Sequence, residues 1–377
     1  MEQTAERVLE GVFAVAKPAH LSSADVLQKL QASFAPSQIF APLLKHQPKR
    51  PSKDDHQVFK MGHGGTLDPL AAGILIVGIG RGTKQLQQYL ACSKTYETVV
   101  VFGASTDTYD CTGSITEQAD YGHVSKDLVE EKLADFRGTI QQQPPVYSAL
   151  KINGIKACEY VRRGKELPRE LEKREMQVSE CTLLAWYEAG KQDIAWPGDK
   201  SPIPAPAARI RLTVCSGFYV RSFAYDLGIA CGSRSYMSEL LRTRQATFTI
   251  REPPESPHLI SALTYAEFEA GEDVWGAKLK PQLVGWIETN PLTDGHVDGR
   301  HRDTKDKLAK EKAEKPIQRF RGEWMAGDKK ERIKQQGGKF KGKYNRRPAG
   351  VLPQGHTREK PGSADLIDTD VLLPTNS

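Results

Sequence analysis

The stretch from Lys60 to Gly73, KMGHGGTLDPLAAG, concentrates residue types that can carry chemistry. It places His63 and Asp68 among four glycines, and an apolar run, GILIVGIG, begins at its last residue. A carboxylate and an imidazole on such a turn can serve as general acid, general base or nucleophile. An aspartate before a proline also commonly accepts hydrogen bonds from its own backbone in a turn. The loop alone therefore leaves Asp68 as either a catalyst or a turn residue.

Glycine-rich loops often bind phosphate, but this one lacks the required spacing. A P-loop ends in Gly-Lys-Ser/Thr, whereas the nearest match here is Gly82-Thr83-Lys84, with the order reversed. A dinucleotide fingerprint needs G-x-G-x-x-G, whereas Gly78, Gly80 and Gly82 form G-x-G-x-G. The sequence therefore predicts no nucleotide cofactor at this loop.

The six cysteines are scattered without a C-x-x-C pair, which is typical of reduced intracellular thiols and does not support a zinc site. We therefore expect neither a metal nor a cofactor. No stretch approaches the roughly 18 apolar residues that span a bilayer, and the acidic N-terminal segment does not match a secretory signal. We expect no membrane association. Nucleus and mitochondrion are the expected compartments, and the cytosol stays open.

Apolar periodicity predicts the elements that position the loop. The polar stretches at 31–57 and 188–206 are predicted to be inserted loops of one catalytic domain, residues 1–290. Strands are predicted at 11–18, 73–80, 94–103 and 209–216, and helices from Ser22 or Ser23 onward, at 83–92, at 125–137, around 223–231 and at 235–244.

The C-terminal segment 291–377 has no hydrophobic periodicity and is predicted to be a disordered, basic tail. Eighteen lysines and arginines stand against eight acidic residues between positions 298 and 347, although the net charge of the whole chain is only +6. A basic segment of this kind often meets nucleic acid.

Five blocks, in order over about residues 11–250, resemble the TruB-type pseudouridine synthases. The central block is residues 62–73, GHGGTLDPLAAG, which matches that family's G-H-x-G-x-L-D-P-x-A-x-G; we call it the signature loop. One block can arise by chance, whereas five in the same order indicate membership. The other blocks are Lys17-Pro18, Lys94-Thr95-Tyr96 with the T-D-x-x-D loop at 106–110, PPVYSALK at 144–151, and CSGFYVR at 215–221 followed by Leu241-Arg242.

This resemblance implies an α+β pseudouridine synthase fold, with a mixed, mainly antiparallel central sheet, flanking helices and an RNA-binding cleft. The implied activity is isomerisation of uridine to pseudouridine at position 55, in the T-loop of tRNA, on a flipped-out nucleotide. No PUA module is evident after residue 250, which counts against the guide-RNA-dependent branch. The expected partner is tRNA, with similar messenger-RNA hairpins as further candidates, and a monomer is expected.

The resemblance also implies roles for single residues. Asp68 would attack C1′ of the ribose or deprotonate C2′, and these two alternatives stay open. Arg221 would hold Asp68 in its ionised form, and Tyr96 would stack on the target base and help to move the C5 proton.

The remaining implied roles concern RNA binding. His63 would replace or support the flipped nucleotide, and Leu241 would line the base pocket. Four cations in matching blocks would contact phosphate: Lys17, Lys84, Lys94 and Arg242.

Two other functions are compatible with part of the sequence. The chain could be an RNA-binding or RNA-folding factor that has lost catalysis, although the intact set of Asp68, Tyr96 and Arg221 argues against this. It could also be a related enzyme that acts mainly on messenger or mitochondrial RNA.

Overall fold

The computed structural model describes residues 7–46, 58–190 and 205–292. They belong to one compact unit, Met1–Asp298. Nearly all of the predicted tail lies outside the described residues, as does most of the predicted loop at 188–206. The prediction of a loop at 31–57 is wrong where helices α1 (Ser23–Phe34) and α2 (Ala41–His46) occupy it, and residues 47–57 lie outside the described residues. Pro42 is tolerated because it lies in the first turn of α2.

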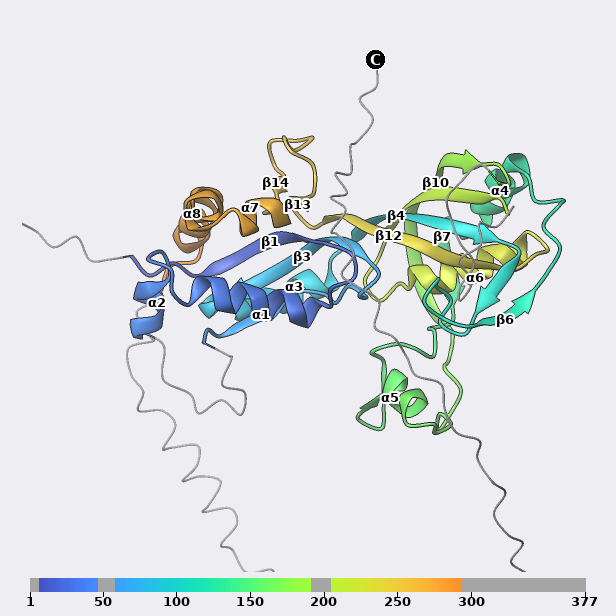
Figure 1. Ribbon diagram of the computed structural model, residues 1–377, viewed down its shortest axis with the longest axis horizontal. Coiled ribbons are helices and arrows are strands. Elements are labelled where there is room, and N and C mark those ends of the chain that lie inside the picture. The colour runs from blue at the N-terminus through green and yellow to red at the C-terminus, as the bar shows by residue number, and fades with distance from the viewer. Residues whose placement is uncertain (1–6, 47–57, 191–204, 293–377) are drawn as a thin grey trace, which may run out of the picture. The chain divides into compact units, whose positions relative to one another are not determined.

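A mixed sheet forms the framework, as predicted, with the order β7-β10-β11-β4-β12-β3-β1 (Figure 1). Neighbours in this order are antiparallel except β12 and β3, which are parallel. The strands of this path are β1 (Gly11–Lys17), β3 (Ala72–Ile79), β4 (Lys94–Phe102), β7 (Gly138–Gln142), β10 (Arg174–Tyr187), β11 (Ala207–Val214) and β12 (Ser235–Gln245).

Shorter elements complete the unit. β2 (Met61–His63) pairs with β3, and β13 (Phe248–Thr249) joins β12 to β14 (Ile260–Ser261). In the described residues, no helix is long and apolar enough to cross a membrane. The remaining strands and helices are β5 (Ala104–Thr106) with β6 (Ile115–Gln118), β8 (Lys151–Ile152) with β9 (Ile155–Lys156), the 3-10 helices Gly80–Gln85 and Ala134–Phe136, and α3 (Leu86–Ala91), α4 (Lys126–Leu133), α5 (Ala157–Arg162), α6 (Val220–Ala230), α7 (Tyr265–Glu269) and α8 (Glu272–Thr289).

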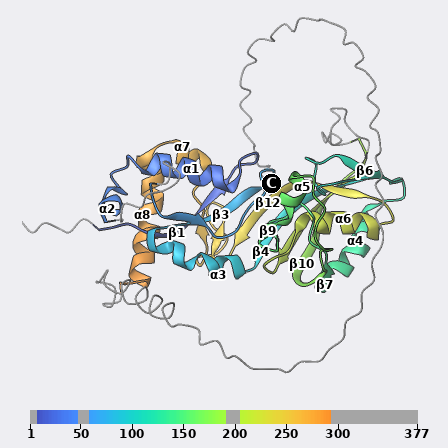
Figure 2. The same cartoon turned by 90° about the horizontal axis from the view of Figure 1, so that it is seen from below.

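Helices cover both faces of β1 and β3, which explains why these strands read as continuous apolar runs. Alternate side chains such as Phe13 and Leu75 pack with α1, α7 and α8 in one cluster. Their neighbours, such as Ala14 and Ile76, pack with α3 in another. Figure 2 shows α1 and α3 on opposite sides of these strands.

A third cluster lies under α4 and α6, where these helices pack on β4, β10 and β11. The helix predicted at 125–137 is largely confirmed: Ser125 caps α4, and its side chain accepts a hydrogen bond from the backbone N–H of Leu128. The same cluster includes Leu67, Ala71 and Tyr96, so the signature loop is anchored in this core.

The helix predicted at 235–244 is wrong, because these residues form strand β12. Register shifts at Met237/Glu239 and at Arg242/Arg244 interrupt the alternation of side chains. Such β-bulges insert an extra residue and shift the period of two that identifies a strand in a sequence. Pairing with β4 and β3 on both sides then decides the conformation.

Gly73 sits where the signature loop enters β3, opposite Arg242 of β12. Its φ of +103° lies in a region that L side chains rarely adopt, and a Cβ there would stand 2.2 Å from the carbonyl oxygen of Arg242. Only glycine therefore allows the parallel pair to form at this point.

We expect Gly73→Ala to lower the free energy of unfolding by about 3 kcal/mol or more, from backbone strain and the clash together. Urea unfolding followed by circular dichroism measures this. Gly285→Ala in α8 is the matched control, since its Cβ would meet nothing within 4 Å. An equal effect of the two changes would contradict the steric argument.

Candidate active site

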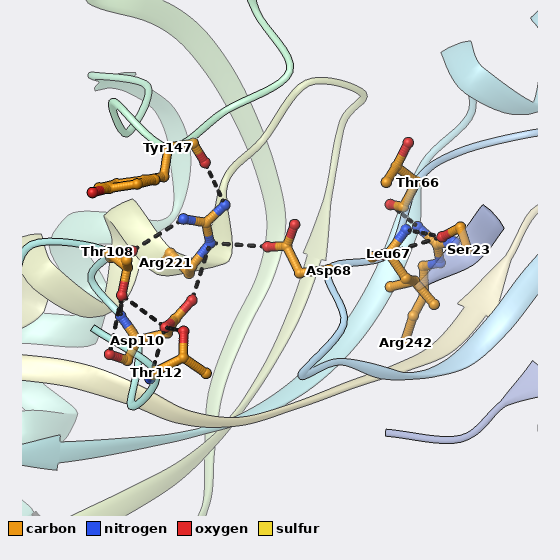
Figure 3. Close-up of polar contacts among 10 residues, drawn as sticks. All are labelled: Ser23, Thr66, Leu67, Asp68, Thr108, Asp110, Thr112, Tyr147, Arg221 and Arg242. Carbon is orange, nitrogen blue, oxygen red and sulfur yellow. Dashed lines mark hydrogen bonds and ion pairs between the residues drawn. The ribbon is translucent and has the colours of Figure 1, made fainter. Parts of the chain in front are cut away.

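Arg221, in the first turn of α6, forms the centre of the site (Figure 3). Its Nε donates to Oδ2 of Asp68 at 2.9 Å, and the same nitrogen lies 3.7 Å from Oδ2 of Asp110. Its two terminal nitrogens donate to the carbonyl oxygens of Thr108, at 3.0 Å, and Tyr147, at 2.9 Å. The planar guanidinium thus joins three loops that are distant in sequence.

The side chain of Asp68 is more exposed to solvent than that of Arg221. Its side chain is 40% exposed, against 8% for that of Arg221. In the part of the chain that the structure describes, its second oxygen, Oδ1, accepts no hydrogen bond. One carboxylate oxygen is therefore fixed and the other is available to a substrate.

Asp110 is a buried carboxylate that sequence reasoning left without a role. Its Oδ1 accepts hydrogen bonds from the Thr108 hydroxyl at 2.8 Å and the Thr112 backbone N–H at 3.0 Å. Its position at the end of the T-D-x-x-D loop was the available signal. A second acid beside Arg221 balances the guanidinium charge and restricts its rotation.

Arg242 holds the signature loop through hydrogen bonds to backbone carbonyl oxygens. Its Nε donates to the carbonyl oxygen of Ile74 at 2.8 Å, and a terminal nitrogen donates to that of Gly65 at 3.1 Å. Its guanidinium also lies 6.0 Å from the centre of the Tyr96 ring. Arg242 is 1% exposed, so the structure makes it a support of the loop, not the phosphate contact that was expected.

Two polar side chains outside the predicted set also hold this loop. The Ser23 hydroxyl accepts from the backbone N–H of Leu67 at 2.9 Å and lies 3.1 Å from the carbonyl oxygen of the same residue. The Gln245 amide donates to the carbonyl oxygen of Gly64 at 2.7 Å. Ser and Gln are common residues, so no sequence pattern singled them out.

Lys17 is likewise buried, at 1% exposure. Its Nζ donates to the carbonyl oxygens of Leu21 at 2.6 Å and Pro18 at 2.8 Å, and reaches that of Pro69 at 3.3 Å. Burial lowers its pKa to about 8, and the nearby Asp68 charge opposes this effect. The amine therefore fastens the turn after Asp68, and its burial leaves it inaccessible to a phosphate.

The other two expected phosphate contacts differ from each other. Lys94 is buried and donates to the carbonyl oxygens of Leu90, at 2.7 Å, and Cys92, at 2.6 Å. Desolvation lowers its pKa. Lys84, in contrast, is exposed at the end of the 3-10 helix, where it can meet a phosphate.

The predicted base-binding residues lie close to the signature loop. Tyr96 of β4 pairs with Arg242 of β12 and is buried with Leu67 in one cluster. Leu241 is half-buried and pairs with Ala72, where the loop enters β3. The sheet thus brings both residues to the loop that carries Asp68.

His63 ends β2, and its ring is half-buried. Its Nδ1 is buried without a hydrogen-bond partner among the described residues. Desolvation, with a smaller contribution from the Arg242 charge, lowers the pKa of this imidazole, so the neutral form is favoured. A neutral ring suits packing against a nucleotide better than it suits holding a phosphate.

The chain is similar to known proteins over most of its length. Residues 53–220 match the model described as TruB family pseudouridylate synthase, N-terminal domain. The tRNA pseudouridine synthase 4 of Schizosaccharomyces pombe is 32% identical, over 73% of this chain and 87% of its own. Pseudouridylate synthase TRUB1 of Mus musculus is 36% identical, over 65% of each chain. A solved Cbf5-Nop10-Gar1 complex matches with 22% identity and a TM-score of 0.42, over 68% of this chain and 53% of that chain.

Lys17 gives a prediction about stability and pH. Its folded pKa of about 8 lies below its ordinary 10.5, so between these values only the unfolded chain holds the proton. The folded state therefore gains stability as pH rises through this window. From pH 7.5 to 9.5 we expect the free energy of unfolding of wild type to rise by about 1–2 kcal/mol relative to Lys17→Met.

Urea unfolding of both proteins at the two pH values tests this. Lys84→Met is the control, because it removes an exposed lysine and leaves the buried amine of Lys17 in place. A difference between wild type and Lys17→Met that does not change with pH would mean that Lys17 keeps its ordinary pKa.

Proposed function

This chain belongs to the TruB family of pseudouridylate synthases, and from that premise we propose that it isomerises uridine to pseudouridine at position 55, in the T-loop of tRNA. The reaction breaks the N1–C1′ bond and joins C5 to C1′. The C5 proton leaves to solvent and N1 takes up a proton, so that the product is an isomer of uridine. It needs no guide RNA in this proposal. The observation that carries it is the Arg221–Asp68 pair, in which one carboxylate oxygen is fixed and the other is open.

Asp68 supplies the reactive carboxylate. Attack on C1′ and removal of the C2′ proton both require the ionised form, facing the ribose. A nucleobase over the site excludes water, which disfavours a charged carboxylate, whereas an adjacent guanidinium favours it. The 2.9 Å hydrogen bond from Arg221 supplies this counter-charge without engaging Oδ1.

The target nucleotide must leave its stack, at a cost of a few kcal/mol. We propose that Tyr96 offsets part of this cost, because an aromatic face stacks on any base. His63 and Leu241, at the edge of the same loop, complete the proposed nucleotide pocket. Lys84 remains the proposed phosphate contact.

We further propose that the chain acts as a monomer, because one chain supplies Asp68, Tyr96 and Arg221. Splayed single-stranded loops are the usual targets of sequence-specific RNA recognition. Messenger-RNA hairpins that resemble the T-loop are therefore proposed as further substrates.

Asp68→Asn is expected to abolish catalysis while leaving tRNA binding within about threefold, because the amide keeps the shape but cannot act as nucleophile or base. Tritium release from C5-labelled uridine in an unmodified tRNA transcript measures catalysis, and filter binding measures affinity. Asp127→Asn, at an exposed acid in the first turn of α4, should behave as wild type. Tight binding without release by wild type would favour an RNA-binding factor.

Arg221→Lys is expected to lower kcat about 100-fold, because one ammonium cannot span the acceptors of the guanidinium and Asp68 is misplaced. The same release assay, under single-turnover conditions, measures it. Arg209→Lys is the control, since Arg209 pairs with Glu239 at 2.9 Å on a partly exposed part of β11. Equal rates for Arg221→Lys and wild type would show that charge alone suffices.

A further inference from the structure

Gln142 is a buried side chain to which the proposed reaction assigns no role. It is 1% exposed and ends strand β7, where it pairs with Arg174 of β10. Pro144 and Pro145 follow closely, and they have no backbone N–H with which to continue the ladder. The chain therefore leaves the sheet just after Gln142.

Both groups of the Gln142 amide bind the backbone of Tyr219, the residue just before α6. The amide oxygen accepts from the N–H of Tyr219 at 2.8 Å, and the amide nitrogen donates to its carbonyl oxygen at 3.0 Å. That carbonyl oxygen also accepts the first hydrogen bond of the helix, from the N–H of Phe223 at 3.1 Å. One side chain thus pairs with Tyr219 as a neighbouring strand would.

These contacts fix the start of α6 from outside the helix. Tyr219 is the N-cap residue, and its side chain makes no capping hydrogen bond. A second contact comes from the next residue of the same segment: the Ser222 hydroxyl donates to the carbonyl oxygen of Gln143 at 2.7 Å. The segment after β7 therefore binds the first turn of α6 on both sides of Arg221.

Arg221 transmits the position of this turn to the site. Its Nε donates to Asp68 at 2.9 Å, and its other nitrogens donate to backbone carbonyl oxygens of two further loops. A planar guanidinium with acceptors on three sides tolerates little displacement of its own backbone. A shift of the first turn of α6 relative to β7 would therefore move Nε away from the carboxylate.

The other half of the ion pair is held in the same manner. Leu67 precedes Asp68, and the Ser23 hydroxyl binds both the N–H of Leu67, at 2.9 Å, and its carbonyl oxygen, at 3.1 Å. Ser23 is 3% exposed. On two segments that are distant in sequence, one buried polar side chain thus binds both backbone groups of a residue shortly before the charged one.

We propose that Gln142 is a positioning residue for the isomerisation, which aligns the guanidinium of Arg221 with the carboxylate of Asp68. Its burial keeps it from contact with RNA, so it acts through Arg221 alone. The inference rests on the proposed function and adds to it a residue outside the five blocks.

A double-mutant cycle separates positioning from a purely structural role. Gln142→Met keeps an unbranched side chain and removes the amide. We expect it to lower the single-turnover rate of tritium release about 10-fold, with tRNA affinity in filter binding within about threefold of wild type. In the Arg221→Lys background, where the guanidinium is already absent, the same change should lower the rate less than about threefold.

Gln177→Met is the control. Its amide lies on β10 in the same pair of strands and exchanges hydrogen bonds with Thr139 at 3.2 and 2.9 Å, but it is exposed. It should leave the rate unchanged in both backgrounds.

Two outcomes overturn the inference: a wild-type rate for Gln142→Met, or an equal loss with and without Arg221→Lys, which would assign Gln142 to general stability. Absence of release by wild type would instead overturn the proposed function.

Gln142→Glu covers the case in which Gln142→Met does not fold. A protonated carboxyl has the shape of the amide and can both accept from Tyr219 and donate to it, whereas the ionised form cannot donate. Burial raises the pKa of a carboxyl, so its rate relative to wild type should fall between about pH 5.5 and about pH 8.5. The fall should disappear in the Arg221→Lys background. A constant ratio, or an equal fall in both backgrounds, overturns the inference.

Discussion

The site depends on one buried guanidinium, that of Arg221. Because water has little access to it, its N–H groups need hydrogen-bond acceptors from the protein. An unpaired buried charge is strongly destabilising, so the chain must bring acceptors to it. Those acceptors come from the signature loop, from the T-D-x-x-D loop and from Tyr147, and they engage all three guanidinium nitrogens. The requirement to satisfy one side chain thus fixes three loops, and Asp68 is the acceptor left partly open.

A related principle governs the other buried cations around the loop. Lys17 and Arg242 direct their charges at main-chain carbonyl oxygens on either side of Asp68. Backbone turns that cannot be held by sheet pairing are held instead by cationic donors. The result is a loop whose backbone is held on both sides of Asp68 before any RNA arrives.

Sequence reasoning identified the signature loop and four strands of the sheet, β1, β3, β4 and β11, because local patterns and ordered motifs carry that information. It assigned no strand to the residues of β7 and β10. It failed for β12, where two bulges removed the alternation of a strand. It also misjudged Lys17, Lys94 and Arg242, because a cation in a motif looks the same whether its partner is a phosphate or a carbonyl oxygen. Only the tertiary structure shows that these side chains point inward. Asp110 stands in the T-D-x-x-D motif, but the motif did not show that its carboxylate lies beside Arg221.

The parallel pairing of β3 with β12 joins Gly73 to Arg242, residues separated by most of the folded chain. The ribosome must therefore have synthesised β12 before Arg242 can form its hydrogen bonds with the loop around Asp68. Contacts of such long sequence separation are also slow to form, because the intervening chain must first lose its freedom. An early fragment that ends before β12 would contain Asp68 without its support. Catalytic competence thus arrives late in synthesis, with the last third of the folded region.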